Sequence, residues 1–290
     1  MALRIEPTSA PLGAFVTGLD IDRLTAAEAA ALQQAFLDHA VLVFRGQTLD
    51  AAQMLTLSQL FGETGLHPIE ALRHEDVPML IVLAGNNGEA VADDDPTGDD
   101  RIGAIPWHTD LVYTETPNRG ALLRAVKIPQ AEGQTGWIDT ARLYRQLPAE
   151  VRTRIQGLRI IHSYAKAHSQ QSMVGGSPDI FPDVIHPLVY VHPENNLPVL
   201  NISPSSAKEI VGLPADEARE LLDYLIAHAC REEEAYVHQW QADDVVLWDN
   251  WRTMHRAYGH LKRHPRLMHR TTLKAELKLG EWVQDAIAAV

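Results

Sequence analysis

The chain has 290 residues, of which 46% are hydrophobic and 22% are charged, and its formal net charge is −13. This composition is ordinary for a globular protein, and the acidic balance argues against nucleic-acid binding, which needs a basic surface. No run approaches the roughly 18 apolar residues of a membrane helix, and the N-terminus lacks the pattern of a signal peptide. We therefore expect a cytoplasmic protein with a single domain over residues 1–290.

The first 85 residues alternate short strands with helices. Segments rich in β-branched and aromatic residues predict strands over 13–21, 40–46 and 79–84. Thr25 and Glu28 form a capping-box signature that predicts the start of a helix, and Asp50 with Gln53 predicts the start of a second one. This part of the chain is therefore expected to contain both kinds of element.

Residues 85–103 are dense in Gly, Asp and Asn, which predicts a surface loop with a solvated acidic face. A loop of this length is often a lid over a site. Strand signals predominate after it, over 121–128, 158–164, 187–192, 198–203, 233–240, 244–248 and 269–277. Helices are predicted over 147–156 and 215–229. This order favours an α+β fold with a mainly β core, closed or built of two sheets, over a doubly wound fold.

The most distinctive local pattern is Trp107-His108-Thr109-Asp110. In an extended segment residues i and i+2 share a face, so His108 and Asp110 would present a ring nitrogen and a carboxylate oxygen to one ion. A hydrogen-bonded pair at a strand end is the alternative. His255 stands out as a third ligand because it follows a buried strand and a polar turn in DVVLWDNWRTMH. Two histidines and one carboxylate are the ligands of non-haem Fe(II) oxygenases, although zinc accepts them too.

Arg266 and Arg270 follow in RLMHRTTL, and a spacing of four on a strand places both side chains on one face. A guanidinium group binds a carboxylate through two hydrogen bonds. One arginine would therefore suit a cosubstrate that chelates iron at one end and carries a free carboxylate at the other, and the second arginine indicates a second anion. The alternative is a pair of surface arginines in a basic C-terminal segment.

Taken together, these motifs resemble the taurine/alkylsulfonate and aryloxyalkanoate dioxygenase family of Fe(II)/2-oxoglutarate enzymes. The resemblance covers nearly the whole chain and rests, in order, on GAFVTGLDI, HAVLVFRGQTLDAAQ, LSQLFGE, WHTD, HPLVYVHP, LWDNWRTMH and RLMHRTTL. It implies a double-stranded β-helix, a cupin-like jelly-roll core with flanking helices, which agrees with the strand-rich C-terminal half.

The resemblance also implies roles for the residues that match the family's motifs. His108, Asp110 and His255 would be the metal ligands. Arg266 would hold the distal carboxylate of 2-oxoglutarate, assisted by Thr135 in EGQTGWID. Fe(II) is thereby implied as the cofactor, with 2-oxoglutarate and O₂ as cosubstrates.

Two further matches and one departure concern the primary substrate. Arg270 and His67 match residues that receive its acidic group. Glu70 stands where the taurine enzymes carry a tyrosine, and IGAIP before the metal motif is apolar where they carry amide and acidic residues. We therefore expect an anionic substrate other than taurine. Glu70 would pair with an amine on that substrate, and a solvent-facing Glu70 is the alternative.

The implied reaction oxidises a C–H bond of a small anionic substrate, a sulfonate, sulfate ester or carboxylate, with release of succinate and CO₂. The alternatives are a zinc hydrolase, in which Arg266 and Thr135 have no role, and a non-catalytic binding protein on the same scaffold. No nucleic-acid or membrane partner is expected, and the family suggests a homo-oligomer, a dimer or tetramer. Cys230 in a predicted helix is expected to be a small apolar residue rather than a nucleophile.

Overall fold

The computed structural model describes residues 2–67, 70–85, 97–170 and 180–288 of the chain. Over these residues the architecture is mixed α and β, with one sheet of seven strands, two of four and one of two. The expected mixed class with a large β component is thus confirmed, and the predicted site residues all belong to the described part.

The seven-stranded sheet combines N-terminal strands with the strand that carries the two arginines. Its order is β1 (Arg4–Pro7), β2 (Ala14–Thr17), β3 (Val41–Phe44), β14 (Val245–Asp249), β6 (Gly120–Lys127), β16 (Arg266–Leu273) and β4 (Ile81–Gly85). β2 and β3 are parallel, and the other neighbours are antiparallel. Every residue of β14 is buried, as expected for a central strand that is covered on both faces.

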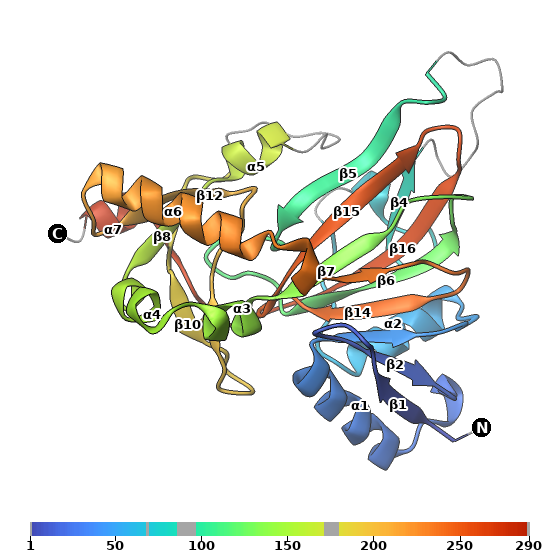
Figure 1. The fold of residues 1–290 in the computed structure, drawn as a ribbon. Coiled ribbons are helices and arrows are strands. Elements are labelled where there is room, and N and C mark those ends of the chain that lie inside the picture. The colour runs from blue at the N-terminus through green and yellow to red at the C-terminus, as the bar shows by residue number, and fades with distance from the viewer. Residues whose placement is uncertain (1, 68–69, 86–96, 171–179, 289–290) are drawn as a thin grey trace.

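A four-stranded antiparallel sheet packs against this one (Figure 1). Its order is β13 (Tyr236–His238), β7 (Thr135–Asp139), β15 (Thr253–Leu261) and β5 (Arg101–His108). A buried cluster joins Trp137 and Tyr236 of this sheet to Val246, Trp248 and Met268 of the larger one. The predicted site residues on β5, β7, β15 and β16 therefore line the same space between two sheets.

Two N-terminal helices cover the outer face of the larger sheet. They are α1 (Ala26–His39) and α2 (Ala51–Gln59). Leu32 and Phe36 of α1 and Met54 of α2 belong to one buried cluster with Phe44 and Leu122 of the sheet. Both helices begin with the predicted capping boxes, because each capping side chain accepts a hydrogen bond from the third helical residue, whose own side chain bonds back.

The remaining elements form a region beside the two sheets (Figure 1). The second four-stranded sheet has the order β12 (Ala207–Val211), β8 (Arg159–His162), β9 (Val184–Pro187) and β17 (Glu281–Trp282), and the ribbon pairs β10 (Val189–Val191) with β11 (Pro198–Leu200). The helices there are α3 (Thr140–Gln146), α4 (Ala149–Ile155), α5 (Tyr164–Gln170), α6 (Ala215–Ala229) and α7 (Val283–Ala288). Three short 3₁₀ turns complete the described elements: η1 (Ile21–Arg23), η2 (Glu70–Leu72) and η4 (Glu232–Glu234).

The long loop predicted over 85–103 is shorter in the structure than in the sequence pattern. β4 extends to Gly85, and β5 already begins at Arg101 because residues 101–105 pair with β15. Residues 86–96 lie outside the described residues, so their predicted role as a lid stays a prediction. Cys230 follows α6 and packs against the neighbouring core, where burial raises the pKa of its thiol, as fits an apolar rather than a nucleophilic residue.

Candidate metal centre

The two predicted histidine ligands face each other on neighbouring strands. His255 of β15 pairs directly with His108 at the end of β5, and the centroids of the two rings are 4.0 Å apart. Next to this pair the register shifts, because β5 has one residue more than β15 between the pairs His255–His108 and Ala257–Ile105. The irregularity contains Pro106, which has no N–H to donate and is tolerated on this edge strand. A bulge of this kind redirects the next side chain, here His108.

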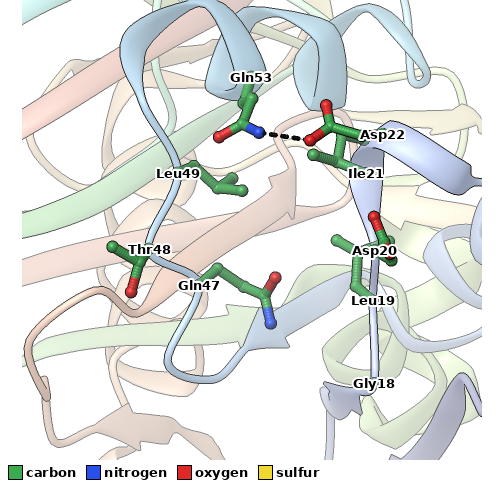
Figure 2. Close-up of a pocket in the computed structure, with 9 residues that line it drawn as sticks. All are labelled: Gly18, Leu19, Asp20, Ile21, Asp22, Gln47, Thr48, Leu49 and Gln53. Carbon is green, nitrogen blue, oxygen red and sulfur yellow. Dashed lines mark hydrogen bonds between the residues drawn. The ribbon is translucent and has the colours of Figure 1, made fainter. Parts of the chain in front are cut away.

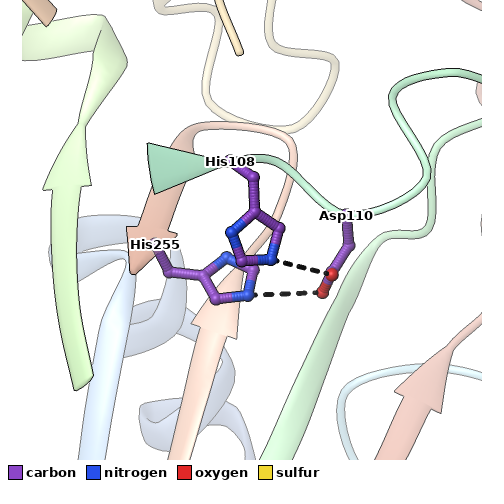
Figure 3. Close-up of side chains that lie close together, drawn as sticks. All are labelled: His108, Asp110 and His255. Carbon is purple, nitrogen blue, oxygen red and sulfur yellow. Dashed lines mark ion pairs between the residues drawn. The ribbon is translucent and has the colours of Figure 1, made fainter. Parts of the chain in front are cut away.

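Asp110 lies beyond the strand rather than on it. β5 ends at His108, and Asp110 begins the turn that follows, so the predicted i and i+2 positions of one strand are not the reason for its approach. Its carboxylate nevertheless points at both rings (Figure 3). The Nε2 atoms of His108 and His255 are 3.6 and 3.7 Å from its two oxygens, and the three ligand atoms all lie within 4.8 Å of one another.

The protonation of this cluster suits a metal ion. His108 Nδ1 is 2.9 Å from the carbonyl oxygen of Pro106. Because a carbonyl only accepts, the ring proton lies on Nδ1, and Nε2 keeps its lone pair for a metal ion. Burial and the neighbouring His108 lower the pKa of His255 well below its usual value, so this ring is neutral. Burial alone would raise the pKa of Asp110, but Arg270 and the two histidines hold it well below its usual value. A neutral imidazole beside an ionised carboxylate is the donor set of non-haem iron.

Arg270 is the charged neighbour of this cluster. Its Nη2 atom donates to Asp110 Oδ2 at 2.5 Å, and its guanidinium lies 5.2 Å from the centre of the Trp248 ring. The side chain is 19% exposed, so it reaches the site from β16 with its charge largely shielded from water. The predicted proximity of Arg270 to the metal ligands is present in the structure.

Arg266 shares the face of β16 that carries Arg270, as its spacing predicts. Met268 lies between the two arginines in the alternation of the strand and belongs to the cluster between the sheets. Burial lowers the pKa of Arg266 to about 10. No described carboxylate or carbonyl accepts a hydrogen bond from its guanidinium. A partly buried arginine without a partner among the described residues is unusual for a purely structural residue.

Thr135 starts β7 and is buried, and its hydroxyl oxygen accepts a hydrogen bond from the Trp240 indole at 3.1 Å. Since the indole uses an acceptor position, the hydroxyl proton stays available to donate to a ligand. A Cβ placed on Gly133, two residues earlier, would be 3.9 Å from Arg266 Cδ, so Thr135 and Arg266 come from adjoining backbone.

The two remaining predicted residues lie near the other end of β16. Gly65 N donates to the carbonyl of Thr272 at 2.9 Å, which brings the segment before His67 alongside this strand. The His67 carbonyl accepts a hydrogen bond from Arg73 Nε at 2.8 Å. Glu70 begins η2 and is exposed, as in the solvent-facing alternative. The substrate roles of His67 and Glu70 stay predictions.

An aromatic cluster beside Asp110 was not anticipated from the sequence. Tyr113 packs edge-on against Tyr164 with ring centroids 4.8 Å apart, and Phe181 lies 5.7 Å from Tyr113. Burial and the charge of Asp110 raise the pKa of Tyr113, which indicates how near its hydroxyl lies to the ligands. The signal was available in the sequence, since Tyr113 follows the metal motif by three residues, but Tyr164 and Phe181 join it only through tertiary contact.

Comparison with known proteins agrees with this geometry. The model of the family described as "Taurine catabolism dioxygenase TauD, TfdA family" matches residues 4–272. The chain belongs to this family. A relative from Delftia acidovorans, the (S)-phenoxypropionate/alpha-ketoglutarate-dioxygenase, is 34% identical over 92% of this chain and 93% of its own. An alpha-ketoglutarate-dependent sulfate ester dioxygenase from Pseudomonas putida is 29% identical over 97% and 92%.

Solved structures support membership of the TauD/TfdA family independently. A taurine dioxygenase from Burkholderia xenovorans superposes with a TM-score of 0.78 at 32% identity, covering 97% of this chain and 92% of its own. AAD-2, solved with Mn(II) and N-oxalylglycine, gives a TM-score of 0.77 at 27% identity over 96% and 100%. This TauD/TfdA protein is therefore an Fe(II)- and 2-oxoglutarate-dependent dioxygenase that uses O₂, and the zinc-hydrolase and non-catalytic alternatives are not favoured.

Two further observations concern the rest of this TauD/TfdA chain. A cavity of about 350 Å³ lies between residues 18–22 and 47–53, where Gln53 Nε2 donates to Asp22 Oδ2 at 2.8 Å (Figure 2). None of the predicted site residues lines it, so it is separate from the metal centre. Within the described ranges no helix is long and apolar enough to span a membrane.

Proposed function

We propose that His108, Asp110 and His255 hold the catalytic Fe(II) of this dioxygenase. The observation that carries the proposal is the convergence of two imidazole nitrogens and one carboxylate from β5, the turn after it and β15. When bound there, Fe(II) supplies the redox chemistry that couples conversion of 2-oxoglutarate to succinate and CO₂ with oxidation of a substrate C–H bond. The chain's own contribution is to keep Asp110 ionised and His255 neutral and to aim all three donors at one point.

Arg266 and Thr135 are proposed to bind 2-oxoglutarate. A partly buried guanidinium that has no carboxylate partner among the described residues favours a dianionic ligand that brings the opposite charge. The Thr135 hydroxyl, with the Trp240 indole on its acceptor side, adds one donor for the same distal carboxylate. Together these groups would fix one end of the cosubstrate, so that the keto acid end faces the metal.

Arg270 is proposed to bind the acidic group of the primary substrate, with His67 contributing from the neighbouring segment. Its guanidinium has five donors, and the bond to Asp110 uses only one nitrogen. The remaining donors suit a carboxylate, sulfonate or sulfate placed beside the metal centre. Substrate and cosubstrate would thereby be bound by two arginines of one strand, β16, with Arg266 holding the cosubstrate.

The remainder of the substrate is proposed to be apolar and aromatic. Tyr113, Tyr164 and Phe181 form an aromatic wall next to Asp110, and offset or edge-on packing against such rings favours an aryl group. Leu111 adds apolar surface, because its side chain is 36% exposed directly after Asp110 and its backbone has φ of 51°. The Delftia acidovorans relative, named for phenoxypropionate, supports an aryloxyalkanoate-type carboxylate over taurine.

The finer description of the fold belongs to the same proposal. The packing of the seven-stranded sheet against the four-stranded sheet that carries His108 and His255 supports a double-stranded β-helix core with flanking helices in one domain over 1–290. The cytoplasmic location and the dimeric or tetrameric state stay predictions.

The proposal is tested by substrate-dependent succinate release. Apoprotein would be loaded anaerobically with Fe(II) and 2-oxoglutarate, exposed to O₂, and assayed with phenoxyacetate, both enantiomers of 2-phenoxypropionate, hexyl sulfate and taurine. We expect an aryloxyalkanoate to give the greatest succinate release, with stoichiometric phenol where the ether carbon is oxidised. Strongest turnover of taurine would contradict the aromatic remainder. No succinate release from folded, iron-loaded protein with any of these anions would contradict the substrate class as a whole.

The substitution Tyr113→Ala tests the contribution of the aromatic wall to substrate binding apart from that of the anion site. The variant should lose preference for phenoxyacetate over hexyl sulfate while its KM for 2-oxoglutarate stays unchanged. A parallel Glu70→Gln variant tests the other expected specificity residue, and an unchanged substrate profile would remove Glu70 from the substrate site.

A further inference from the structure

The side chain of Asn250 is bonded to the backbone of the metal ligand Asp110. The Asp110 N–H donates to Asn250 Oδ1 at 3.0 Å, and Asn250 Nδ2 donates to the Asp110 carbonyl at 2.9 Å. This reciprocal pair is the exchange that two residues of an antiparallel ladder make through their backbones. Asn250 therefore replaces the strand partner that Asp110 lacks once β5 has ended.

Asn250 is itself held firmly. It is 1% exposed, its Nδ2 atom also lies 3.1 and 3.0 Å from the carbonyl and side-chain oxygens of Asn118, and its backbone N–H donates to the Arg119 carbonyl at 3.1 Å. The residue before it, Asp249, is fully buried and accepts hydrogen bonds from Arg119 and His192. The amide is thus presented to Asp110 by a firmly held turn, since its own bonds to Asn118 and the charged hydrogen bonds of the preceding Asp249 resist its movement.

Asp110 needs such support more than the two histidines do. His108 and His255 belong to paired strands, whereas Asp110 lies in the turn and its carboxylate is drawn toward Arg270 at 2.5 Å. Without a hold on its backbone the whole residue is free to shift toward that cation. A carboxylate displaced from the two Nε2 atoms would no longer complete the three-donor set.

We infer that Asn250 is a positioning residue that sets the affinity of the metal centre by fixing the backbone of Asp110. The inference rests on the proposed metal-binding function. Asn250 touches neither metal nor substrate, and it acts only through the ligand it holds. Groups that orient metal ligands in this way change metal affinity by about tenfold to a hundredfold when they are removed.

The test is metal binding by the full chain without cosubstrate or turnover. Co(II) would be titrated calorimetrically into apoprotein of the wild type, Asn250→Ala, Asn250→Asp and Asn195→Ala, with thermal unfolding measured for each. Asn195 is the matched control, because its side chain also accepts from one backbone N–H (Leu197) and donates to one carbonyl (Leu37), neither of which belongs to a ligand. Asn250→Asp keeps the shape and the acceptor oxygen and replaces the donor by an acceptor, so it gives a second, differently disrupted variant whose folding is checked by the same unfolding measurement.

We expect Asn250→Asp to bind Co(II) about tenfold to a hundredfold more weakly than the wild type. Asn195→Ala should bind Co(II) like the wild type even where its melting temperature falls. Wild-type affinity in Asn250→Asp, or an equal loss in Asn195→Ala, overturns the positioning role. If the wild-type chain binds no Co(II), the proposed metal centre is wrong, and the inference fails with it. This outcome differs from the loss of the positioning role alone, in which the wild type binds Co(II).

Discussion

Arg266 at the start of β16 and Arg270 in its middle carry the same side chain in opposite electrostatic states. Arg270 is neutralised by Asp110 and lies over the Trp248 ring, whereas Arg266 has no described carboxylate partner and its pKa is lowered by burial to about 10. An unmatched cation between two sheets destabilises the free protein, and a ligand that brings the opposite charge removes that penalty. The difference supports the proposal that Arg266 binds an anionic ligand.

The largest expected effect follows from removing the unmatched arginine. Arg266→Ala should raise the KM for 2-oxoglutarate about a hundredfold, because a buried charge-assisted pair contributes on the order of 3 kcal/mol to ligand binding. Steady-state kinetics with varied 2-oxoglutarate measure this change. Arg263→Ala is the control, since Arg263 belongs to the same basic segment but pairs with the exposed Asp99. Equal effects in the two variants would contradict a dedicated role for Arg266.

Substitution of Arg270 should change a different kinetic constant from substitution of Arg266. Arg270→Ala is expected to raise the KM for the primary substrate roughly thirtyfold and to change the KM for 2-oxoglutarate much less, because its free donors face the substrate anion. Varying each substrate in turn separates the two constants. The reverse pattern, with 2-oxoglutarate affected most, would exchange the roles of Arg266 and Arg270.

The comparison also predicts that replacing Arg266 and replacing Arg270 change the free energy of unfolding of the metal-free protein in opposite directions. Arg266→Met should raise the free energy of unfolding by about 1 kcal/mol, because it replaces an uncompensated charge by an apolar chain of similar length. Arg270→Met should lower it by about 2 kcal/mol, because it leaves the Asp110 carboxylate without its cation. Urea denaturation of apoprotein measures both. Destabilisation by both substitutions would mean that Arg266 has a structural partner after all.

An effect of comparable size concerns the buried histidine behind the turn of Asp110. His186 Nε2 lies 2.9 Å from the Thr114 carbonyl, and burial lowers its pKa to about 4. In the unfolded chain this histidine binds a proton as the pH falls through about 6.5, whereas in the folded protein it stays neutral down to about pH 4. The free energy of unfolding therefore falls as the pH decreases from about 6.5 to about 4. Between pH 7.5 and 5 the loss should be roughly 2 kcal/mol.

His186→Asn removes this titrating group. The free energy of unfolding of the variant should therefore depend less steeply on pH than that of the wild type over the same interval. Identical slopes would show that the proton is taken up elsewhere, whatever the stability of the variant at neutral pH.

Local patterns in the sequence predicted much of this structure, and tertiary contacts explain the rest. The capping boxes at Thr25 and Asp50 specify helix starts from four residues each, so both were predicted correctly. β5 was not predicted, because residues 101–105 lie in a Gly- and Asp-rich pattern and become a strand only by pairing with β15. The turn position of Asp110 was missed for the same reason.

The site was predictable in its chemistry and less so in its support. His108, Asp110 and His255 were assigned by ligand type and family motif, and the structure brings them together. The contacts of Asn250 and of Trp240 join residues more than 100 positions apart, so no local spacing indicates them. The aromatic group around Tyr113 likewise depends on which segments the fold places beside the metal motif.

The connection of β16 with the turn after β5 through Arg270 and Asp110 has a consequence for biosynthesis. These residues are 160 positions apart, and β14, the centre of the seven-stranded sheet, joins β3 to β6 only near the end of the chain. A nascent polypeptide emerging from the ribosome therefore exposes the edges of β3 and β6 until residue 249 has left the exit tunnel, and unpaired edges of this kind invite aggregation. Folding is expected to be slow because its long-range pairings close large loops.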